Sequence, residues 1–253
     1  MILNYKSYGE GEKVLIIVHG LFGSLDNWST LGRRFSENQK VIIVDQRNHG
    51  HSFHSEEMNY EVMAKDLIVL MDELKIERAQ FIGHSMGGKT MMKMAMIDPN
   101  RIERMVIADI GPKRYEAHHD EILEALHGLD LEEVSSRTEA EEAMSKMIKN
   151  RGVLLFLLKN LYWVEKGKLG WRMNLPVINA HMEDILDSVG EDTVMVPSLF
   201  IRGGKSAYIL DEDFMSIQMQ FQKSEIRSIP AVGHWLHAEA PDTFFDLVKE
   251  FIH

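Results

Sequence analysis

The chain has 253 residues, of which 45% are hydrophobic and 26% are charged, and this is enough for one large domain with a substantial core. Its 28 basic and 39 acidic residues give a net charge of −11, which argues against binding to nucleic acids or to anionic membranes. It contains no cysteine, which excludes disulfide bonds, thiolate metal sites and a cysteine nucleophile.

The first residues, 1–14, do not form a basic segment followed by a long apolar run, so we expect no signal peptide. No apolar stretch reaches the roughly 18–20 residues of a membrane helix, so we expect no stable membrane insertion. Both observations favour a cytoplasmic protein, with a location inside an organelle as the alternative.

Short apolar runs alternate with longer amphipathic segments. Most of these runs are continuously apolar, as in parallel strands that are covered on both faces, whereas residues 3–9 alternate like an antiparallel edge strand. In chain order the patterns predict strands at 3–9, 14–20 and 41–47, a helix at 60–74, a strand at 79–85, a helix at 87–97, strands at 104–110, 197–204 and 225–230, and a helix at 241–252. This order predicts an α/β fold with a doubly wound, mostly parallel sheet of about eight strands.

The alternation of strands and helices breaks between about residues 112 and 190. Three segments there have helical patterns and none resembles a strand; they are residues 116–129, 138–150 and 153–167. We therefore predict a core domain formed by residues 1–112 and 190–253, with a helical cap at 113–189 inserted between two strands of the sheet.

The segment Gly83-His84-Ser85-Met86-Gly87 has the pattern G-x-S-x-G. The pentapeptide alone is a weak signal, but here a strand is predicted before it and an amphipathic helix after it. Glycines without a Cβ allow neighbouring backbone to pack closely, so a strained turn can present the serine above the sheet. The alternative is a glycine-rich start of a helix with an incidental serine. We predict that Ser85 is a nucleophile.

These features resemble the α/β-hydrolase family, and the resemblance extends from residue 3 to the end of the chain. The segment VHGLFGS (18–24) is similar to the family's first oxyanion loop, and VDQRNHGHS (44–52) is similar to its D-x-R-x-x-G-x-S turn. The resemblance implies that the backbone N–H groups of Leu21 and Met86 bind the oxyanion. It also implies that His19 organises the loop, because the family's catalytic base comes last in the chain.

The segment AVGHWLHAEAPDTFF (231–245) resembles the family's late G-H-x-x-x-x-E-x-P motif. His234 follows Gly233 in a predicted loop between the last strand and the last helix. A neutral imidazole can take the serine proton near pH 7 and return it to the leaving group. His237 is the alternative base, but a structural role suits it better because the glycine precedes His234.

The acid of the family usually follows the strand at 197–204, where this chain has Ser206, whose neutral hydroxyl cannot supply the charge. Asp211 lies further on, where it suits a helix cap. Asp109 lies in the otherwise apolar run RMVIADIGP, and a buried carboxylate needs a charged or hydrogen-bonding partner. We therefore predict Asp109 as the acid that orients His234, against the alternative that it only caps a turn.

An acid at this position, together with HGLFGSLDNW, DQRNHGHS, GHSMGGK and ADIGP, resembles the YbfF-type bacterial esterases and the related mitochondrial abhydrolase-domain-11 proteins. The resemblance implies a serine carboxylesterase with thioesterase ability that cleaves small-molecule acyl esters or acyl-CoA through an acyl-serine intermediate. It implies no cofactor, and no histidine spacing suggests a metal site.

We expect Phe22, Ser206 and Trp235 near the substrate, with Ser206 either facing the acyl group or bonding to Asp109. Four cations are candidates to attract a CoA phosphate or are simply solvated: Lys113, Arg114, Arg202 and Lys205. A carbon–carbon bond hydrolase or a menaquinone-pathway type of lyase could use the same triad, because a fold does not fix a reaction. A non-catalytic ligand-binding protein is a further alternative, and the oligomeric state stays open.

Overall fold

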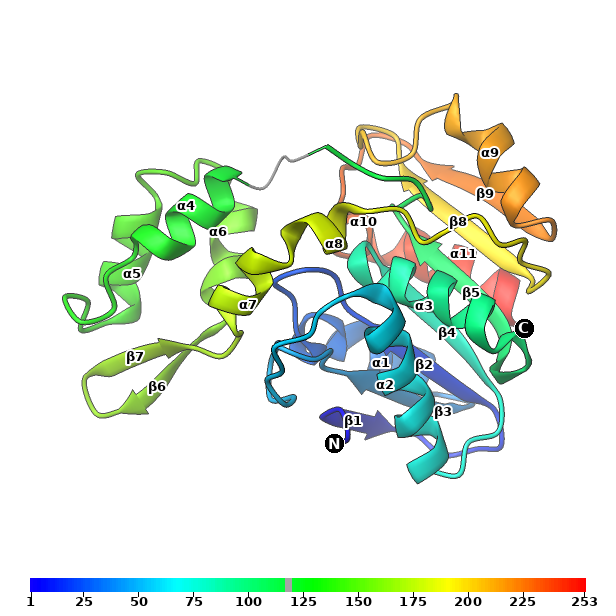
Figure 1. The fold of residues 1–253 in the computed structure, drawn as a ribbon, viewed down its shortest axis with the longest axis horizontal. Coiled ribbons are helices and arrows are strands. Elements are labelled where there is room, and N and C mark those ends of the chain that lie inside the picture. Colours follow the sequence, from blue (N-terminus) through cyan, green and yellow to red (C-terminus); the bar gives the residue numbers. More distant parts are fainter. Residues whose placement is uncertain (117–119) are drawn as a thin grey trace.

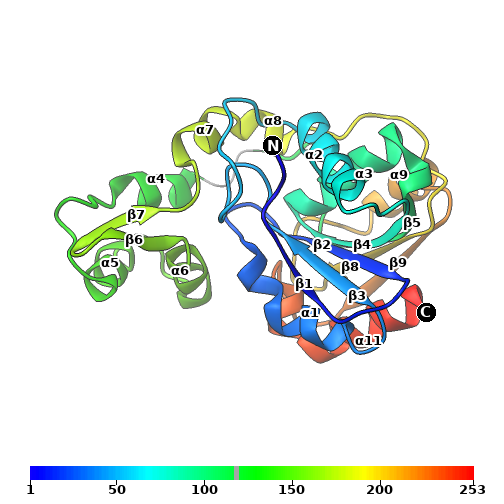
Figure 2. The ribbon, with the colours of Figure 1, turned by 90° about the horizontal axis from the view of Figure 1, so that it is seen from below.

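The computed structural model describes residues 1–116 and 120–253, and its centre is one large twisted sheet (Figures 1 and 2). Seven strands lie in the order β1-β3-β2-β4-β5-β8-β9. They are β1 (Tyr5–Tyr8), β2 (Val14–Val18), β3 (Lys40–Val44), β4 (Ala79–His84), β5 (Ile102–Ala108), β8 (Ser198–Gly203) and β9 (Ser224–Ile229). Only β1 is antiparallel to its neighbour. The predicted α/β class and its strands are confirmed. Within the described residues the main sheet has seven strands, one fewer than the approximately eight that were predicted.

Helices cover both faces of the sheet (Figure 2). Alternate side chains of a strand point to opposite faces, so in β2 Ile16 and Val18 belong to one apolar cluster and Leu15 and Ile17 to another. The first cluster includes α2 (Tyr60–Glu73), α3 (Met86–Ile97) and α9 (Asp213–Gln220), and the second includes η1 (Leu25–Trp28), α1 (Ser29–Phe35), α10 (Leu236–Glu239) and α11 (Pro241–Ile252). A short 3₁₀ helix, η2 (Pro99–Arg101), precedes β5.

The chain between β5 and β8 forms a lobe beside the sheet (Figure 1). Its elements are α4 (Asp120–Gly128), α5 (Arg137–Met144), α6 (Arg151–Leu158), β6 (Leu161–Glu165), β7 (Lys168–Trp171), α7 (Leu175–Ala180) and α8 (Met182–Leu186). Buried side chains of the lobe, such as Leu126 and Leu157, belong to the same apolar cluster as α2 and α3. The start of the helix predicted at 116–129 includes residues 117–119, which lie outside the described part of the chain.

The helix predicted at 153–167 is wrong in its second half. Helix α6 ends at Leu158, and β6 and β7 form an antiparallel hairpin in which Leu161 pairs with Trp171 and Trp163 with Leu169. Gly167 supplies the turn with a φ of +82°, a conformation that a side chain would disfavour. A short apolar run does not distinguish a helix from a strand by its periodicity, and here cross-strand pairing determined the outcome.

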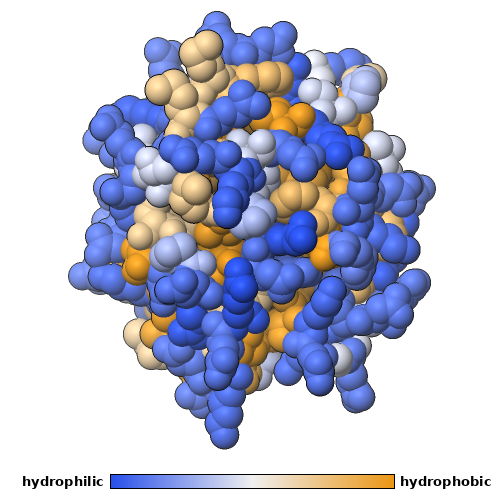
Figure 3. All heavy atoms as spheres, turned by 90° about the vertical axis from the view of Figure 1, so that its right-hand side faces the viewer, coloured by the Kyte–Doolittle hydropathy of each residue, from blue (hydrophilic) through white to orange (hydrophobic). Residues whose placement is uncertain are grey.

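The face of the molecule opposite the lobe is mostly hydrophilic, with separate hydrophobic patches between the polar side chains (Figure 3). The longest helix among the described residues, α2, has 14 residues, and a bilayer requires roughly 20. In the described ranges, no helix has the length and apolar character needed to cross a membrane.

Candidate active site

Ser85 lies on a strained turn between β4 and α3. Its φ of +51° and ψ of −121° place it in a region that L residues rarely adopt. A Cβ at Gly83 would lie 2.6 Å from the carbonyl oxygen of Gly87, and a Cβ at Gly87 would lie 2.4 Å from that of Val18. Both glycines are therefore required by close backbone contacts, as the G-x-S-x-G pattern predicts. The serine side chain does not cap α3.

Asp109 and His234 meet at the carboxyl end of the sheet. The parallel pairing of β4 with β5 aligns His84 with Ala108, so Ser85 and Asp109 follow neighbouring strands at the same level. The Oδ2 atom of Asp109 lies 2.8 Å from Nδ1 of His234, and the carboxylate is completely buried while the imidazole is 16% exposed. The structure therefore brings the predicted acid and the predicted base into contact.

The carboxylate of Asp109 has two further donors. The N–H of Gly203 donates to Oδ1 at 2.8 Å, and the hydroxyl of Ser206 donates to Oδ2. Burial raises the pKa of Asp109 to about 6, and these two hydrogen bonds act in the opposite direction by favouring the ionised form. Of the two positions expected for Ser206, the structure thus has the one in which it bonds to the acid.

Ser85 and His234 line the same cavity, which has a volume of about 160 Å³. Most of its wall is apolar and comes from both the sheet domain and the lobe: Leu21, Phe22, His84, Ser85, Ile122, Val153, Phe156, Leu157, Tyr208, His234 and Trp235. Phe22 and Trp235, which were expected near the substrate, belong to this wall, and Ser206 is outside it. The cavity suits a small apolar group next to the serine hydroxyl.

Leu21 and Met86, the expected oxyanion donors, both border a smaller cavity that also includes Ser85. Met86 is the first residue of α3, so its N–H has no acceptor within the helix. The loop of Leu21 passes close to the serine, because a Cβ at Gly20 would lie 3.2 Å from the Cβ of Ser85. The N–H of Phe22 is bound at 3.2 Å by Nε2 of His49, which fixes the loop beside the serine.

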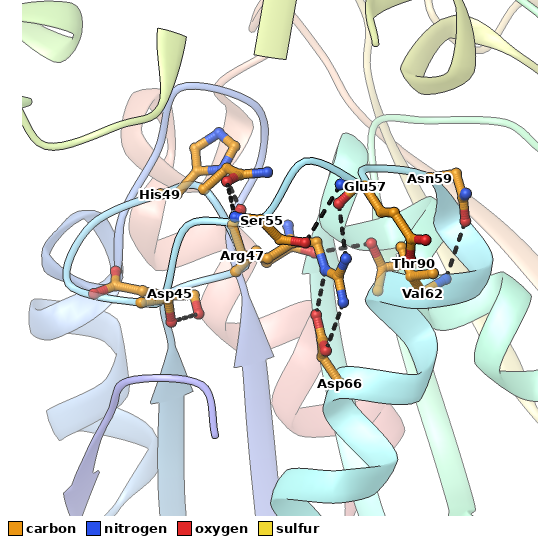
Figure 4. A network of polar contacts seen from close by, with 12 residues as sticks. Asp45, Arg47, His49, Ser55, Glu57, Asn59, Val62, Asp66 and Thr90 are labelled. Atoms are coloured by element: carbon orange, nitrogen blue, oxygen red, sulfur yellow. Dashed lines mark hydrogen bonds and ion pairs between the residues drawn. The ribbon is translucent and has the colours of Figure 1, made fainter. Parts of the chain in front are cut away.

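A buried network of hydrogen bonds holds the loop of Leu21 in place. Nε2 of His19 accepts from the N–H of Gln46 at 3.0 Å, so its Nδ1 donates to the carbonyl of Gly20 at 2.8 Å. In the turn at 44–52, Arg47 pairs with Asp66 through two hydrogen bonds of 2.6 and 2.9 Å, as Figure 4 shows. Burial lowers the pKa of His19 to about 4, which fits a neutral, structural histidine.

His237 is buried and is not part of the wall around Ser85. Its ring stacks on Trp28 at 4.2 Å with an interplanar angle of 8°. Burial lowers the pKa of His237 well below the ordinary value. Among the described residues, no three His, Asp or Glu side chains are grouped so that they could hold a metal ion.

Two residues that position His234 were not found from the sequence. Tyr208 stacks on the imidazole, with ring centroids 3.9 Å apart and planes 19° from parallel. Nε2 of His84 lies 2.9 Å from the carbonyl oxygen of His234 and so ties the histidine loop to the serine turn. The sequence shows that His84 precedes Ser85, but it does not reveal this contact, because His234 lies 150 residues further along the chain.

Lys89 is a third residue that the sequence did not single out. It lies one turn after Ser85 on α3 and is 1% exposed. Its side chain reaches both chain segments that connect the sheet domain to the lobe, residues 112–115 and 186–189, which are called here the two crossings. Its Nζ donates to the carbonyls of Lys113 at 2.8 Å and Asp187 at 2.5 Å. Burial lowers the pKa of Lys89 to about 7. One buried side chain thus connects the nucleophile helix to both ends of the lobe.

Comparisons with known proteins agree with the fold described above. Residues 13–134 match the family model described as the alpha/beta hydrolase fold. The esterase YbfF of Escherichia coli is 37% identical over 94% of this chain and 92% of its own, and the sn-1-specific diacylglycerol lipase ABHD11 of Danio rerio is 38% identical over 96% of this chain and 80% of its own. A solved marine microorganism esterase superposes with a TM-score of 0.96 at 37% identity and 99% coverage of both chains.

Proposed function

This chain belongs to the α/β-hydrolase family and is a hydrolase of the esterase and lipase type, and from this premise we propose that it cleaves carboxylic esters and acyl thioesters through an acyl-serine intermediate. The observation that carries the proposal is the 2.8 Å contact between Asp109 and His234, with His234 and Ser85 in one cavity. Acyl-CoA esters are the proposed thioester substrates.

In the proposed mechanism the Oγ atom of Ser85 attacks the carbonyl carbon while its proton passes to Nε2 of His234, since Nδ1 faces Asp109. The tetrahedral oxyanion is bound by the N–H groups of Leu21 and Met86. The imidazolium then protonates the leaving oxygen or sulfur as the acyl-serine forms. A water molecule, deprotonated by His234, attacks the acyl carbon, and the proton returns to Ser85 as the acid product leaves.

We also propose that residues 113–189 act as a lid over Ser85. The support is that Val153, Phe156 and Leu157 of this segment line the cavity of the serine. A lid of this kind excludes water from the acyl group and strengthens the electrostatic interactions in the site. A cytoplasmic location and a reaction without a cofactor are part of the same proposal.

The test is hydrolysis of p-nitrophenyl butyrate and butyryl-CoA by the wild type and three variants. Ser85→Ala should abolish turnover and labelling by a fluorophosphonate. Asp109→Asn should lower kcat by orders of magnitude, because a neutral amide does not stabilise the imidazolium. The control is Asp211→Asn, whose carboxylate is 84% exposed and pairs with Arg202, and it should behave as the wild type.

Two results would contradict the proposal. Full activity of Asp109→Asn would mean that another residue is the acid. Labelling of Ser85 without turnover of either substrate would favour the carbon–carbon hydrolase or lyase alternative, and absence of both labelling and turnover would favour a non-catalytic binder.

A further inference from the structure

A larger cavity, of about 820 Å³, adjoins the cavity of about 160 Å³ that Ser85 and His234 line. The two share Val153, Phe156, His234 and Trp235. Ser85 lines only the smaller one, so the larger one, called here the outer cavity, lies on the side of the imidazole. Its walls come from α6 of the lobe, from the loop after β8 and from the loop that carries His234.

Two lysines line the outer cavity, one from the lobe and one from the sheet domain. Lys159 follows α6, and Lys205 follows β8, where its N–H is held by the carbonyl of Val232 at 2.8 Å. Both are exposed, and neither ammonium group has an ion pair among the described residues. The acidic residue of the wall, Glu239, already accepts a hydrogen bond from the N–H of Gly233 at 2.8 Å.

Among the described residues, Lys205 differs from the other cations predicted near the site in its lack of an acidic partner. Of the four cations considered from the sequence, Lys113 pairs with Asp213 at 2.6 Å, and Arg202 and Arg114 also have acidic partners. Lys205 is the one without such a partner in the described part of the chain. The wall of the outer cavity thus carries two ammonium groups against the one carboxylate of Glu239. In a chain with a net charge of −11, this local excess of positive charge beside the imidazole of His234 favours an anionic ligand there.

We propose that the outer cavity binds the leaving group of the substrate, and that Lys159 and Lys205 bind a carboxylate or phosphate on that group. The imidazole of His234 protonates the leaving atom, so the departing alcohol or thiol lies on the imidazole side, whereas the acyl group remains in the apolar cavity at Ser85. This inference rests on the proposed esterase function and adds to it a charge preference in the leaving group.

The test compares three butanoyl esters with the same acyl group: methyl 4-(butanoyloxy)benzoate, which is neutral, 4-(butanoyloxy)benzoate, and 4-(butanoyloxy)phenyl phosphate. For each enzyme, kcat/KM of each anionic ester is divided by kcat/KM of the neutral ester. Differences in leaving-group reactivity then cancel between variants. The variants are Lys159→Gln, Lys205→Gln and the double variant, and the control is Lys166→Gln, in the exposed turn between β6 and β7.

Each single variant should lower this ratio about three- to tenfold, and the double variant should lower it further. The ratio is measured separately for the carboxylate ester and for the phosphate ester, and the ester whose ratio falls more in the lysine variants carries the preferred anionic group. Added salt should weaken the preference in the wild type more than in the double variant. Ratios in the lysine variants that equal those of the wild type and of Lys166→Gln would overturn the subsite. Failure of the wild type to hydrolyse any of the three esters would instead overturn the esterase proposal beneath it.

Discussion

Two opposing effects act on the carboxylate of Asp109. Complete burial disfavours its charge and raises its pKa to about 6, whereas the hydrogen bonds from Ser206 and Gly203 favour the charge. The proposed mechanism requires this carboxylate to be ionised when His234 becomes an imidazolium. Within the proposed mechanism the hydroxyl of Ser206 therefore has a use, because it helps to keep Asp109 ionised near neutral pH.

The first prediction concerns Ser206→Ala. Loss of the hydroxyl removes one donor, so the pKa of Asp109 rises and the acidic limb of the kcat profile moves to higher pH. We expect kcat for p-nitrophenyl butyrate to fall about three- to tenfold at pH 6 and to change little at pH 8.5. Ser206→Thr, which keeps the hydroxyl, should restore the profile. An unchanged acidic limb in Ser206→Ala would contradict this account of the hydrogen bond.

Ser85 and Asp109 were predicted from local patterns of the chain, whereas His234 was predicted from the resemblance of residues 231–245 to a motif of the α/β-hydrolase family. A glycine-bounded serine between a strand and a helix and a carboxylate in an apolar run are both local patterns. The contact between Ser206 and Asp109 is different, because it depends on how β5 pairs with β8. Two outcomes were open for Ser206, and only the pairing of these strands decides between them.

At the scale of elements, Lys89 is one of the side chains that attach the lobe to the sheet domain. Both crossings are bonded to each other, since the N–H of Tyr115 donates to Leu186 and that of Val189 to Pro112. Lys89 then bonds both crossings to α3. A buried ammonium group is costly unless it is satisfied by acceptors, and here backbone carbonyls and the nearby ring of Tyr115 at 4.8 Å supply them.

The second prediction is that Lys89→Met loosens the lobe. Methionine fills a similar volume but leaves the carbonyls of both crossings without this donor. Because the lobe supplies one wall of the cavity, KM for p-nitrophenyl butyrate should rise about fivefold or more, with a smaller effect on kcat, and trypsin should cut the lobe faster. Lys93→Met, which removes a single contact of 3.3 Å to Val189, should have a smaller effect. A wild-type KM in Lys89→Met would exclude this role.

The elements of the sheet were predictable, and those of the lobe were less so. Strands buried on both faces are continuously apolar, and this marks them in the sequence. The hairpin of β6 and β7 has no such signal, because its strands bury only part of their surface and Trp163 and Val164 are 48% and 52% exposed. Its existence depends on pairing between the two strands and on the turn at Gly167, which the helical pattern of the preceding residues obscured.

At the scale of the whole molecule, four histidines are enclosed in a neutral form. Burial lowers the pKa of His19 to about 4 and that of His49 to about 3, and it lowers those of His84 and His237 well below the ordinary value of 6.5. All four lie around the loops at the carboxyl end of the sheet. The stability of the fold is thus linked to the protonation of residues that support the site.

The direction of these pKa shifts determines how the stability of the fold changes with pH. Below about pH 6.5 the unfolded chain binds protons on these histidines that the folded chain does not, so the free energy of unfolding should fall as the pH falls. Each histidine contributes up to about 1.4 kcal/mol per pH unit. Lys89, whose pKa is lowered to about 7, acts in the same direction, and Asp109, with its raised pKa, opposes them. The urea midpoint should therefore be clearly lower at pH 5.5 than at pH 7.5. His237→Phe, which keeps an aromatic ring against Trp28, should reduce this difference by about a quarter, since it removes one of four such groups. A midpoint at pH 5.5 that equals or exceeds the one at pH 7.5 would show that these histidines are not held neutral by the fold.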